Sequence, residues 1–415
     1  MAFARSLWEE ARASGPVSFS RRRLRPLGAF AVAAAALGCA GCSNFLSSHD
    51  LSTTAAAAAP PEAAAGAPAT TADYKVGLVL PFSASGNAGS VASAMRNAAE
   101  MALADFRATN IQLVAKDDAG TAQGAQVAVQ QAVDEGAQVV LGPLFSHAVS
   151  AAKPIARSRN VPLIAFSTDS SVAGPGAFLL SFLPESDVER VVGYAVSQGR
   201  RSFIGLVPAN AYGSVVEGEF KQSVARRGGR VVAFERYGDD RNRIGDIAKV
   251  VAQSASRADA LFIPDGETVG DVVVALAAAG FNLRGVTILG TELWDDPKVF
   301  ARPELDGALY AGPDPAGFRA FSDRYRDRYR EDPPRPAALA YDAVSLTVAL
   351  VKAQPGQRIT AEMLANPSGF SSEFNGVFRL RADGSNQRGL AVLKVTPSGP
   401  QVVAPPLRSF APSAT

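Results

Sequence analysis

Short apolar runs alternate with amphipathic segments from Tyr74 onward. Residues 75–80 (KVGLVL) have the composition of a buried strand, and apolar residues then recur at helical spacing from Val91 to Phe106. The cycle repeats, with strands predicted at 111–114, 139–141, 162–166, 203–207, 230–236, 260–263 and 286–289, and helices at 123–135, 153–158, 188–198, 214–227, 246–255 and 269–279. This alternation predicts an α/β fold of parallel sheets covered by helices on both faces.

The pattern favours two lobes, because one sheet holding all these strands would be very large. Two late helices, 318–330 and 337–352, follow each other without a clear strand between them, so they must pack on earlier strands. The predicted lobes are 74–183 plus 312–356 and 184–311 plus 357–396, with 397–415 as a C-terminal tail. Since ligands of open α/β sheets bind beyond the carboxyl ends of the strands, we expect a central cleft between the lobes.

The first 42 residues have the order of an export signal. Four arginines between residues 21 and 25 precede an apolar run, 27–37, which is too short to span a bilayer. Small residues then lead to Cys39 and Cys42, as in the lipobox of bacterial lipoproteins. We favour Cys42 over Cys39 as the acylated residue, and ordinary cleavage beside an incidental Cys is the alternative. Residues 43–73, rich in Ala, Pro, Ser and Thr, are predicted to form a disordered tether.

Charge and composition exclude several classes of protein. The chain has 415 residues, with 41 Lys and Arg against 39 Asp and Glu, so it lacks the positive field of a general nucleic-acid binder. A mature chain starting at Cys42 would be slightly acidic, because residues 1–41 hold six arginines and two glutamates. Two Cys and two His are too few for a disulfide scaffold or a His-rich metal centre. We expect no metal and no cofactor.

The order of short motifs resembles the type I periplasmic binding protein superfamily, which includes the leucine/isoleucine/valine-binding proteins, over nearly all of 74–396. The matching segments are VGLVLPFSASGNAG at the start, KDDAGT at 116–121, LGPLFS at 141–146, PLIAFST at 162–168, NAYG at 210–213 and AYDAV at 340–344. The resemblance implies a non-enzymatic protein with two Rossmann-like lobes, parallel sheets, hinge crossovers and a central cleft.

Within that superfamily the chain most resembles the lipoprotein branch of penicillin-binding-protein activators, which regulate peptidoglycan synthases. The segments that carry this likeness are ADALFIPDGE at 258–267, LGTELWDDP at 289–297, YAGPDPAGF at 310–318 and RGLAVLKVTPSG at 388–399.

Candidate ligand-binding residues of the first lobe follow two predicted strands. Ser146 comes after a strand and a Gly-Pro turn, where a hydroxyl and free backbone N–H groups at a helix start suit a carboxylate. It matches the Ser that contacts the ligand carboxylate in the amino-acid-binding relatives, and an ordinary helix N-cap is the alternative. Ser167, Thr168 and Asp169 follow the next strand. Asp169 stands roughly where the relatives have Thr, and a carboxylate there would repel that of an amino acid.

In the second lobe, Tyr212 could wall the pocket with its ring, although buried Tyr is also common as packing. Asp265 and Glu267 lie near the position of the acid that holds the ligand ammonium in the relatives, and solvated loop acids are the alternative. Trp294 is expected to pack.

Sequence motifs of enzymes are weak or missing. Ser150 and Lys153 match the S-x-x-K of penicillin-interactive serine enzymes, but the partner motifs S-D-N and K-T-G are absent, so we reject that interpretation. His147 beside Ser146 is an improbable dyad, since adjacent side chains seldom face one another.

The predicted function is accessory regulation. The resemblance implies a periplasmic lipoprotein, held at a bacterial membrane only by its lipid anchor, with the outer membrane favoured. Its partner would be a peptidoglycan synthase, with a small polar ligand such as an amino acid as modulator. The alternative is the substrate-binding component of an ABC transporter, delivering branched-chain or other amino acids or amides to a permease. The fold alone does not decide between them.

Overall fold

The computed structural model describes residues 74–238 and 241–410. The predicted export signal with Cys39 and Cys42, the predicted tether and the last five residues of the predicted tail lie outside the described residues.

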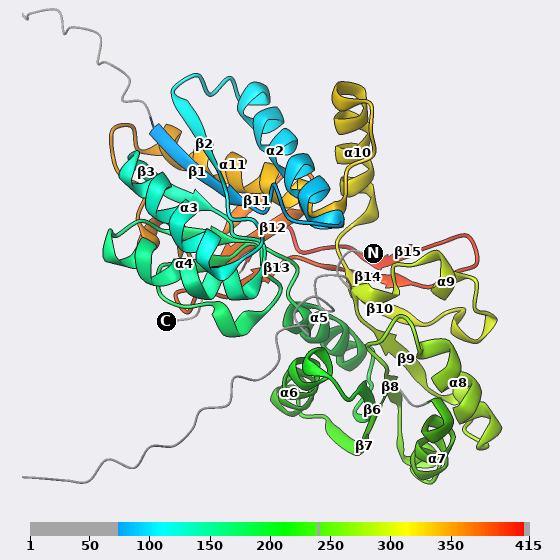
Figure 1. Ribbon diagram of the computed structural model, residues 1–415. Helices are drawn as coiled ribbons and strands as arrows, with labels where there is room; N and C mark the ends of the chain where they lie inside the picture. Colours follow the sequence, from blue (N-terminus) through cyan, green and yellow to red (C-terminus); the bar gives the residue numbers. More distant parts are fainter. Residues whose placement is uncertain (1–73, 239–240, 411–415) are drawn as a thin grey trace, which may run out of the picture. The chain divides into compact units, whose positions relative to one another are not determined.

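The first lobe is built on a five-stranded parallel sheet. Its strands, in the order β2-β1-β3-β4-β5, are β1 (Tyr74–Leu80), β2 (Ile111–Asp117), β3 (Ala137–Leu141), β4 (Leu163–Ala165) and β5 (Ala177–Leu179). One face is covered by α2 (Asn87–Asp105) and α11 (Arg335–Ala353), and the other by α3 (Ala122–Asp134) and α4 (Ser146–Ser158) (Figure 1). The three inner strands are almost entirely buried, as expected for a sheet covered on both faces.

The second lobe is built on a seven-stranded sheet in the order β15-β14-β10-β9-β8-β6-β7. The parallel strands are β6 (Ser202–Pro208), β7 (Arg230–Tyr237), β8 (Ala260–Phe262), β9 (Thr287–Gly290) and β10 (Leu309–Gly312), and the antiparallel ones are β14 (Ala391–Lys394) and β15 (Gln401–Ala404). Its faces are covered by α5 (Pro184–Ser197) with α6 (Ala211–Arg226), and by α7 (Arg241–Ala252) with α8 (Val269–Ala278). The α/β fold with two lobes is therefore confirmed.

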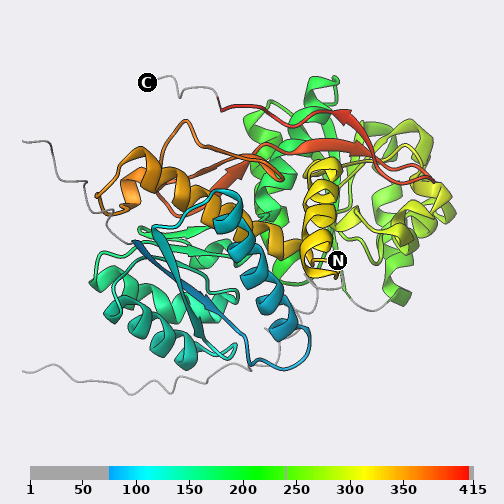
Figure 2. The same cartoon turned by 90° about the horizontal axis from the view of Figure 1, so that it is seen from above.

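The C-terminal third returns to the first lobe before it ends in the second. It contains α10 (Pro315–Tyr329), α11, α12 (Ala361–Leu364) and an antiparallel sheet of β11 (Phe370–Ser372), β12 (Gly376–Leu380) and β13 (Asn386–Arg388). Figure 2 shows α11 lying beside α2, and the two helices are in contact. By length and composition α11 could cross a membrane, but it is a mostly buried core helix here.

The predicted boundary of the second lobe differs from this packing in one place. We assigned 357–396 to the second lobe, but Leu364, Phe374 and Phe378 lie in the apolar core of the first. The turn after β12 also joins the sheet of the first lobe, since Gly384 O accepts the Leu179 N–H at 2.9 Å. Only from β14 onward does the chain pair with β10. Three crossovers therefore connect the lobes, after β5, after β10 and after β13.

Capping residues explain where α3 and α6, the helices that follow β2 and β6, begin. Thr121 caps α3 by accepting the Gly124 N–H at 2.9 Å, and Asn210 caps α6 by accepting the Gly213 N–H at 2.8 Å. Gly213 itself is required by close approach, because a Cβ there would lie 1.7 Å from Pro208 O. Polar loop residues are in this way held next to the carboxyl ends of the strands.

The core of the second lobe gives a direct test of its packing. Phe220 is fully buried, and its ring stacks on Phe262 with centroids 4.6 Å apart. We expect Phe220→Ala to lower the free energy of unfolding by ~3–5 kcal/mol, because it removes a large apolar side chain and leaves a cavity. Denaturant unfolding followed by circular dichroism measures the change.

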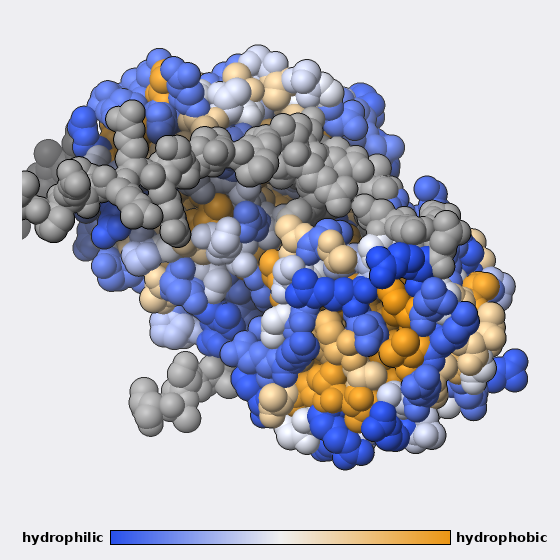
Figure 3. Space-filling model, turned by 60° about the horizontal axis from the view of Figure 1, so that its bottom comes forward, coloured by the Kyte–Doolittle hydropathy of each residue, from blue (hydrophilic) through white to orange (hydrophobic). Residues whose placement is uncertain are grey.

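A matched control lies on the surface of the same lobe. Figure 3 shows apolar side chains gathered on one face of this lobe. Val274 of α8 is 49% exposed. Val274→Ala should change the free energy of unfolding by less than about 0.5 kcal/mol. Equal losses for the two variants would contradict the described packing.

Candidate functional site

The first-lobe candidates lie on the loops that follow β3 and β4. Ser146 is the first residue of α4 and is half-buried, and the N-cap is the preceding Phe145, not Ser146. Ser167 is buried, and its Oγ accepts the Asp169 N–H at 3.1 Å. Ser146 is therefore placed at a helix start, where a carboxylate could be bound, whereas Ser167 supports its own loop.

Thr168 and Asp169 are half-buried beside Ser167. Asp169 caps a short 3₁₀ helix, η1 (Ser170–Val172), and its Oδ1 accepts the N–H and the hydroxyl of Ser171 at 3.0 and 2.6 Å. The Asp169 carboxylate is thus used within its own loop. It supplies local structure in this position, whatever its effect on a ligand.

The second-lobe candidates follow β6 and β8, with Tyr212 in the first turn of α6 and Glu267 on the loop before α8. Tyr212 is half-buried, and its hydroxyl lies 2.7 Å from Thr291 Oγ1 and 3.2 Å from Pro264 O. Burial raises the pKa of Tyr212 well above its ordinary value, so the phenol stays neutral. Glu267 is exposed, and its N–H donates to Asp265 Oδ1 at 2.8 Å.

Asp265 is committed to the structure of the second lobe. Its carboxylate also accepts the hydroxyls of Tyr237, at 3.2 Å, and of Thr268. The fully buried Trp294 donates its indole N–H to Asp265 O at 3.2 Å, so this tryptophan packs as predicted. These bonds leave Asp265 poorly suited to hold the ammonium group of a ligand.

Two further residues of the predicted motifs have structural partners. Lys153 Nζ donates to the carbonyl oxygens of Val172 and Ala173 at 3.1 and 3.3 Å, which explains its position without Ser150. The exposed His147 places Nε2 2.9 Å from Gly120 O and stacks on Phe145, with ring centroids 5.6 Å apart. Among the residues that the structure describes, no group of three or more His, Cys, Asp or Glu could hold a metal ion.

An ion pair between the lobes escaped the sequence analysis. Arg335, the first residue of α11, places Nε 3.2 Å from Oε1 of Glu292, which begins a 3₁₀ helix, η4 (Glu292–Trp294), after β9. The two side chains are only 19% and 17% exposed. Asp187 of α5 adds a second carboxylate, whose Oδ2 accepts the Glu292 N–H at 3.1 Å. The helical pattern placed residue 335 just before a predicted helix but gave no sign of a partner on the other lobe.

Burial controls the protonation of these carboxyl groups. Burial raises the pKa of Asp187 well above its ordinary value, and the nearby charge of Glu292 adds to that rise. Burial also raises the pKa of Glu292, against the opposing attraction of Arg335. The guanidinium group of Arg335, followed by that of Arg388, therefore favours an ionised Glu292 in this environment.

Arginine and phenylalanine side chains form a continuous series next to the crossovers. The Arg335 guanidinium carbon lies 4.8 Å from the Phe318 ring centroid and 5.2 Å from that of Phe182. Arg388 lies 4.4 Å from Phe182 and 5.4 Å from Phe378, and its Nε donates to Ser181 O at 2.9 Å. Phe182 is on the first crossover, Phe318 follows the second, and Arg388 precedes the third. Cation–π contacts therefore connect the first crossover with segments that flank the second and third.

Comparison with known proteins supports the two-lobed fold described above. The profile of a family described as periplasmic binding protein matches residues 73–400. No curated protein matches the sequence. The three solved structures described below are under 25% identical in sequence to this chain, so the likeness to them supports the fold alone.

Three of these structures are informative. One from Rhodospirillum rubrum, assigned as a branched-chain amino acid ABC transporter, has a TM-score of 0.70 and 20% identity, covering 80% of this chain and 99% of its own. A solute-binding protein of an ABC transporter from R. palustris, in complex with benzoate, has a TM-score of 0.55 and 22% identity, covering 82% and 98%. The branched-chain amino acid binding protein LivJ from Streptococcus pneumoniae, in complex with isoleucine, has a TM-score of 0.54 and 21% identity, covering 80% and 99%.

The ion pair between the lobes is testable by a double-mutant cycle. Arg335→Met should lower the free energy of unfolding by ~3–5 kcal/mol, because it leaves buried carboxylates without their counter-charge. The double variant Arg335→Met/Glu292→Gln should lose less than the sum of the two single changes, as measured by denaturant unfolding. Arg326→Met breaks exposed pairs with Asp323 and Asp332 and should have little effect. Strict additivity at Arg335 and Glu292 would contradict the coupling.

The Asp118 carboxyl group predicts a pH dependence. Burial raises the pKa of Asp118 to about 6 from 3.8, with a further rise from Asp117. Because the folded pKa exceeds the unfolded one, the folded state is favoured below pH ~4 and loses this advantage as the pH rises through about 6. Asp118→Asn should therefore flatten the stability profile between pH 4 and 7, measured by thermal unfolding at fixed ionic strength.

The neighbouring Asp117 is the matched control, because its shift has the opposite sign. Partial burial acts to raise its pKa, but hydrogen bonds from Ser83 and Ala119 hold the pKa of Asp117 below its ordinary value. Asp117→Asn should thus remove stability that the wild type has above pH ~4 and loses as the pH falls. If both variants changed the profile in the same direction, the assignment of Asp118 would be wrong.

Proposed function

The chain belongs to the periplasmic binding protein family, and from this premise we propose that it is a non-enzymatic ligand-binding lipoprotein of the periplasm that regulates a peptidoglycan synthase. Homologues of this family are substrate-binding proteins, so ligand binding is the general property. The regulatory role is the specific part of the proposal. It is supported by the motifs of the activator branch and by the predicted lipobox and tether, which suit a partner near a membrane.

One observation carries the preference for regulation over amino-acid delivery. An amino acid held by the lobes needs a carboxylate for its ammonium group, and two carboxylates of the second lobe are already used by the chain itself. Glu292 pairs with Arg335 across the lobes, and Asp265 accepts hydrogen bonds from its own loop. A free amino acid, one of the solutes that the ABC alternative allows, would therefore find no free carboxylate for its ammonium group at Glu292 or Asp265.

The second candidate function is delivery of a solute to an ABC permease. It is favoured by the solved neighbours, since the chain covers nearly the full length of proteins described as ABC transporter components. The half-buried Ser146 at the start of α4 would suit a carboxylate. One neighbour is described in complex with benzoate, a carboxylate without an ammonium group.

Partner capture tests the proposal. The full lipidated chain, cross-linked in the membrane and purified, should bring down a penicillin-binding protein as the enriched membrane partner. Its enrichment should not require an added amino acid. Capture of an ABC permease without a penicillin-binding protein would overturn the regulatory role.

Calorimetry with the purified chain and the standard amino acids provides a second readout. Micromolar binding of one amino acid that Ser146→Ala abolishes would favour the transport candidate, because Ser146 lies on the predicted carboxylate loop. Unchanged binding in Ser146→Ala would exclude that loop as the site.

The predicted lipid anchor has its own test. Cys42→Ser should abolish incorporation of labelled palmitate and release the protein from the membrane fraction. Cys39→Ser, the matched change three residues earlier, should leave both unchanged. The reverse result would assign acylation to Cys39, and incorporation by neither wild type nor variants would refute the anchor.

A further inference from the structure

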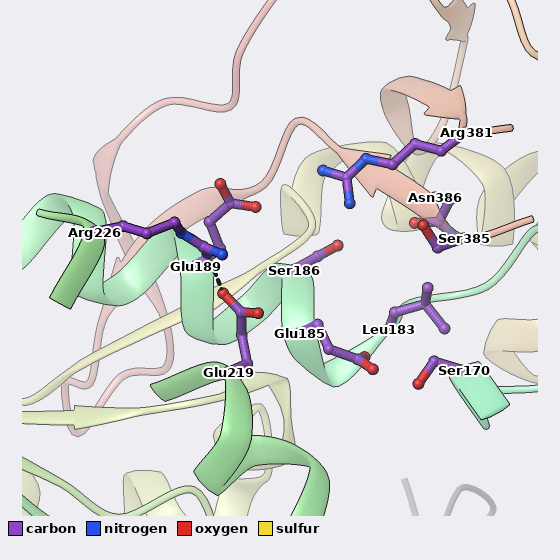
Figure 4. Close-up of a pocket in the computed structure, with 10 residues that line it drawn as sticks. All are labelled: Ser170, Leu183, Glu185, Ser186, Glu189, Glu219, Arg226, Arg381, Ser385 and Asn386. Atoms are coloured by element: carbon purple, nitrogen blue, oxygen red, sulfur yellow. Dashed lines mark hydrogen bonds and ion pairs between the residues drawn. The ribbon is translucent and has the colours of Figure 1, made fainter. Parts of the chain in front are cut away.

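Two cavities of the structure are lined by none of the predicted ligand residues. The larger, of about 390 Å³, is lined by residues of both lobes, among them Glu185 and Arg381, and its Arg226 and Glu219 pair with each other at 2.6 Å (Figure 4). It belongs to the space between the lobes, where a ligand is already expected. The smaller cavity, of about 260 Å³, is formed by the second lobe alone.

The smaller cavity lies at the amino ends of parallel strands of the second lobe. It is lined by the first residues of β9 and β10, Thr287 and Leu309, and by Tyr194, Gln198 and Arg200 at and after the end of α5. Ligands of open α/β sheets bind at the opposite edge, beyond the carboxyl ends of the strands. A ligand of this cavity would therefore occupy a site separate from the cleft between the lobes.

Two cations without a carboxylate partner lie at this cavity. Among the described residues, the Arg200 guanidinium forms no ion pair within 4.0 Å, and its Nε has no hydrogen-bond partner. Lys394 of β14 lies directly opposite Leu309 of β10 in an antiparallel pair, so both side chains leave the sheet on the same face. Lys394 likewise forms no ion pair within the described part of the chain.

Two acids near this edge of the sheet do not cancel these charges. Asp259, before β8, uses its Oδ2 to accept the backbone N–H groups of Arg201 and Ser202, both at 2.9 Å. The bond from Arg201 is the largest of the effects that hold the pKa of Asp259 below its ordinary value, and the charge of Arg200 adds to it. Asp306 is exposed on the turn before β10.

The end of α5 is also compatible with an anion. A helix C-terminus ordinarily repels negative charge through its free carbonyl oxygens. Here Ala195 O accepts the Arg200 N–H at 3.0 Å, and Val196 O accepts Nη1 of Arg201 at 2.9 Å. These bonds occupy the carbonyl oxygens with donors of the chain itself.

Neutral donors complete the lining of the cavity. Tyr194 and Thr287 each contribute a hydroxyl group, and Gln198 contributes an amide. Among the described residues, none of these three side-chain groups has a hydrogen-bond partner. The cavity thus combines positive charge with several donors that the protein does not use.

We propose that this cavity binds a phosphate group, held by the cations Arg200 and Lys394 and by the neutral donors Tyr194, Gln198 and Thr287. A phosphate monoester offers three strong acceptor oxygens and more than one negative charge near neutral pH, which matches this set better than the two oxygens of a carboxylate. An arginine side chain can also bind a phosphate through two parallel N–H donors. The volume suits the phosphate with a small organic group attached.

The inference goes beyond the proposed function, because the site lies outside the cleft and holds for either partner. The phosphate can belong to a soluble compound or to the headgroup of a phospholipid, and the recognition chemistry is the same for both sources.

Calorimetry of the full chain at constant ionic strength tests the site. The probes are inorganic phosphate, glycerol 3-phosphate and acetate. We expect both phosphates to bind and acetate to bind at least about tenfold more weakly, as loss of a charged hydrogen bond implies.

Substitutions assign the binding to this cavity. Arg200→Met and Lys394→Met should each weaken the binding of glycerol 3-phosphate by about tenfold, since each removes one cation. Arg302→Met, which removes an exposed arginine beside Gly270 of α8, is the matched control and should bind normally. The thermal unfolding midpoint of each variant without ligand shows whether it is folded.

Vesicles distinguish the two sources of phosphate. The full chain carrying Cys42→Ser, which removes the predicted anchor, is sedimented with vesicles of phosphatidylglycerol. Sedimentation that glycerol 3-phosphate competes away and Arg200→Met abolishes would assign the site to a lipid headgroup. Binding of the soluble phosphates without sedimentation would assign it to a soluble compound.

Three results would overturn the site. They are the absence of binding by both phosphates at millimolar concentration, equal affinity for acetate, and equal weakening by Arg302→Met and Arg200→Met. None of these results bears on the capture of a membrane partner, so the site and the proposed function can fail separately.

Discussion

The guanidinium group of Arg335 is the charge on which the contact between the two lobes depends. It extends from the first turn of α11, in the first lobe, to Glu292 beyond β9 in the second. Asp187 and Asp295 lie near the same group, and burial raises the pKa of each while Arg335 opposes the rise. Removing three carboxyl groups from water is costly unless a cation accompanies them. The start of α11 is therefore fixed by the ion pair with Glu292 of the opposite lobe as well as by packing on α2.

The series of rings around Arg335 extends this constraint to the connections between the lobes. Phe182 contacts both Arg335 and Arg388, while Phe318 and Phe378 stand at its two ends. Burial lowers the pKa of Arg388 to about 10, which leaves it charged near neutral pH. The members of the series lie on the first crossover, just after the second and just before the third, so their contacts tie the chain segments at all three connections together.

Periodicity in the sequence was sufficient to predict the α/β architecture. It did not predict elements of only a few residues or contacts between residues far apart in the chain. Strands such as β1 and β6 are long buried runs, and their positions were predicted within a residue or two. The strands β5 and β13 have three residues each and carry no periodic signal. The helix α4 was predicted to start only at residue 153, whereas it starts at Ser146. Pro154 lies inside it, and a proline is more typical of a helix start than of a helix interior.

The candidate site was harder to predict than the fold. Motif order predicted that Ser146 and Tyr212 follow strands, and the structure has them at the starts of α4 and α6, after β3 and β6, but their role in ligand binding stays a prediction. The pairing of Arg335 with Glu292 joins residues 43 positions apart on different lobes, and no local pattern in one sequence reports it. The cavity that is lined by both Glu185 and Arg381 is of the same kind, since it forms only because the chain returns to the first lobe after residue 312.

The three crossovers make both lobes discontinuous in sequence, and this limits the order in which the chain can fold. One face of the first sheet is covered by α11, so strands made from residues 74–179 keep that apolar face uncovered until residues 335–353 are available. The second sheet likewise gains β14 and β15 only from the last described residues. Neither lobe can be completed as a contiguous fragment emerging from a ribosome or a translocation channel. Such a topology favours a chain that stays unfolded during passage across a membrane and becomes compact only after nearly all of it has arrived.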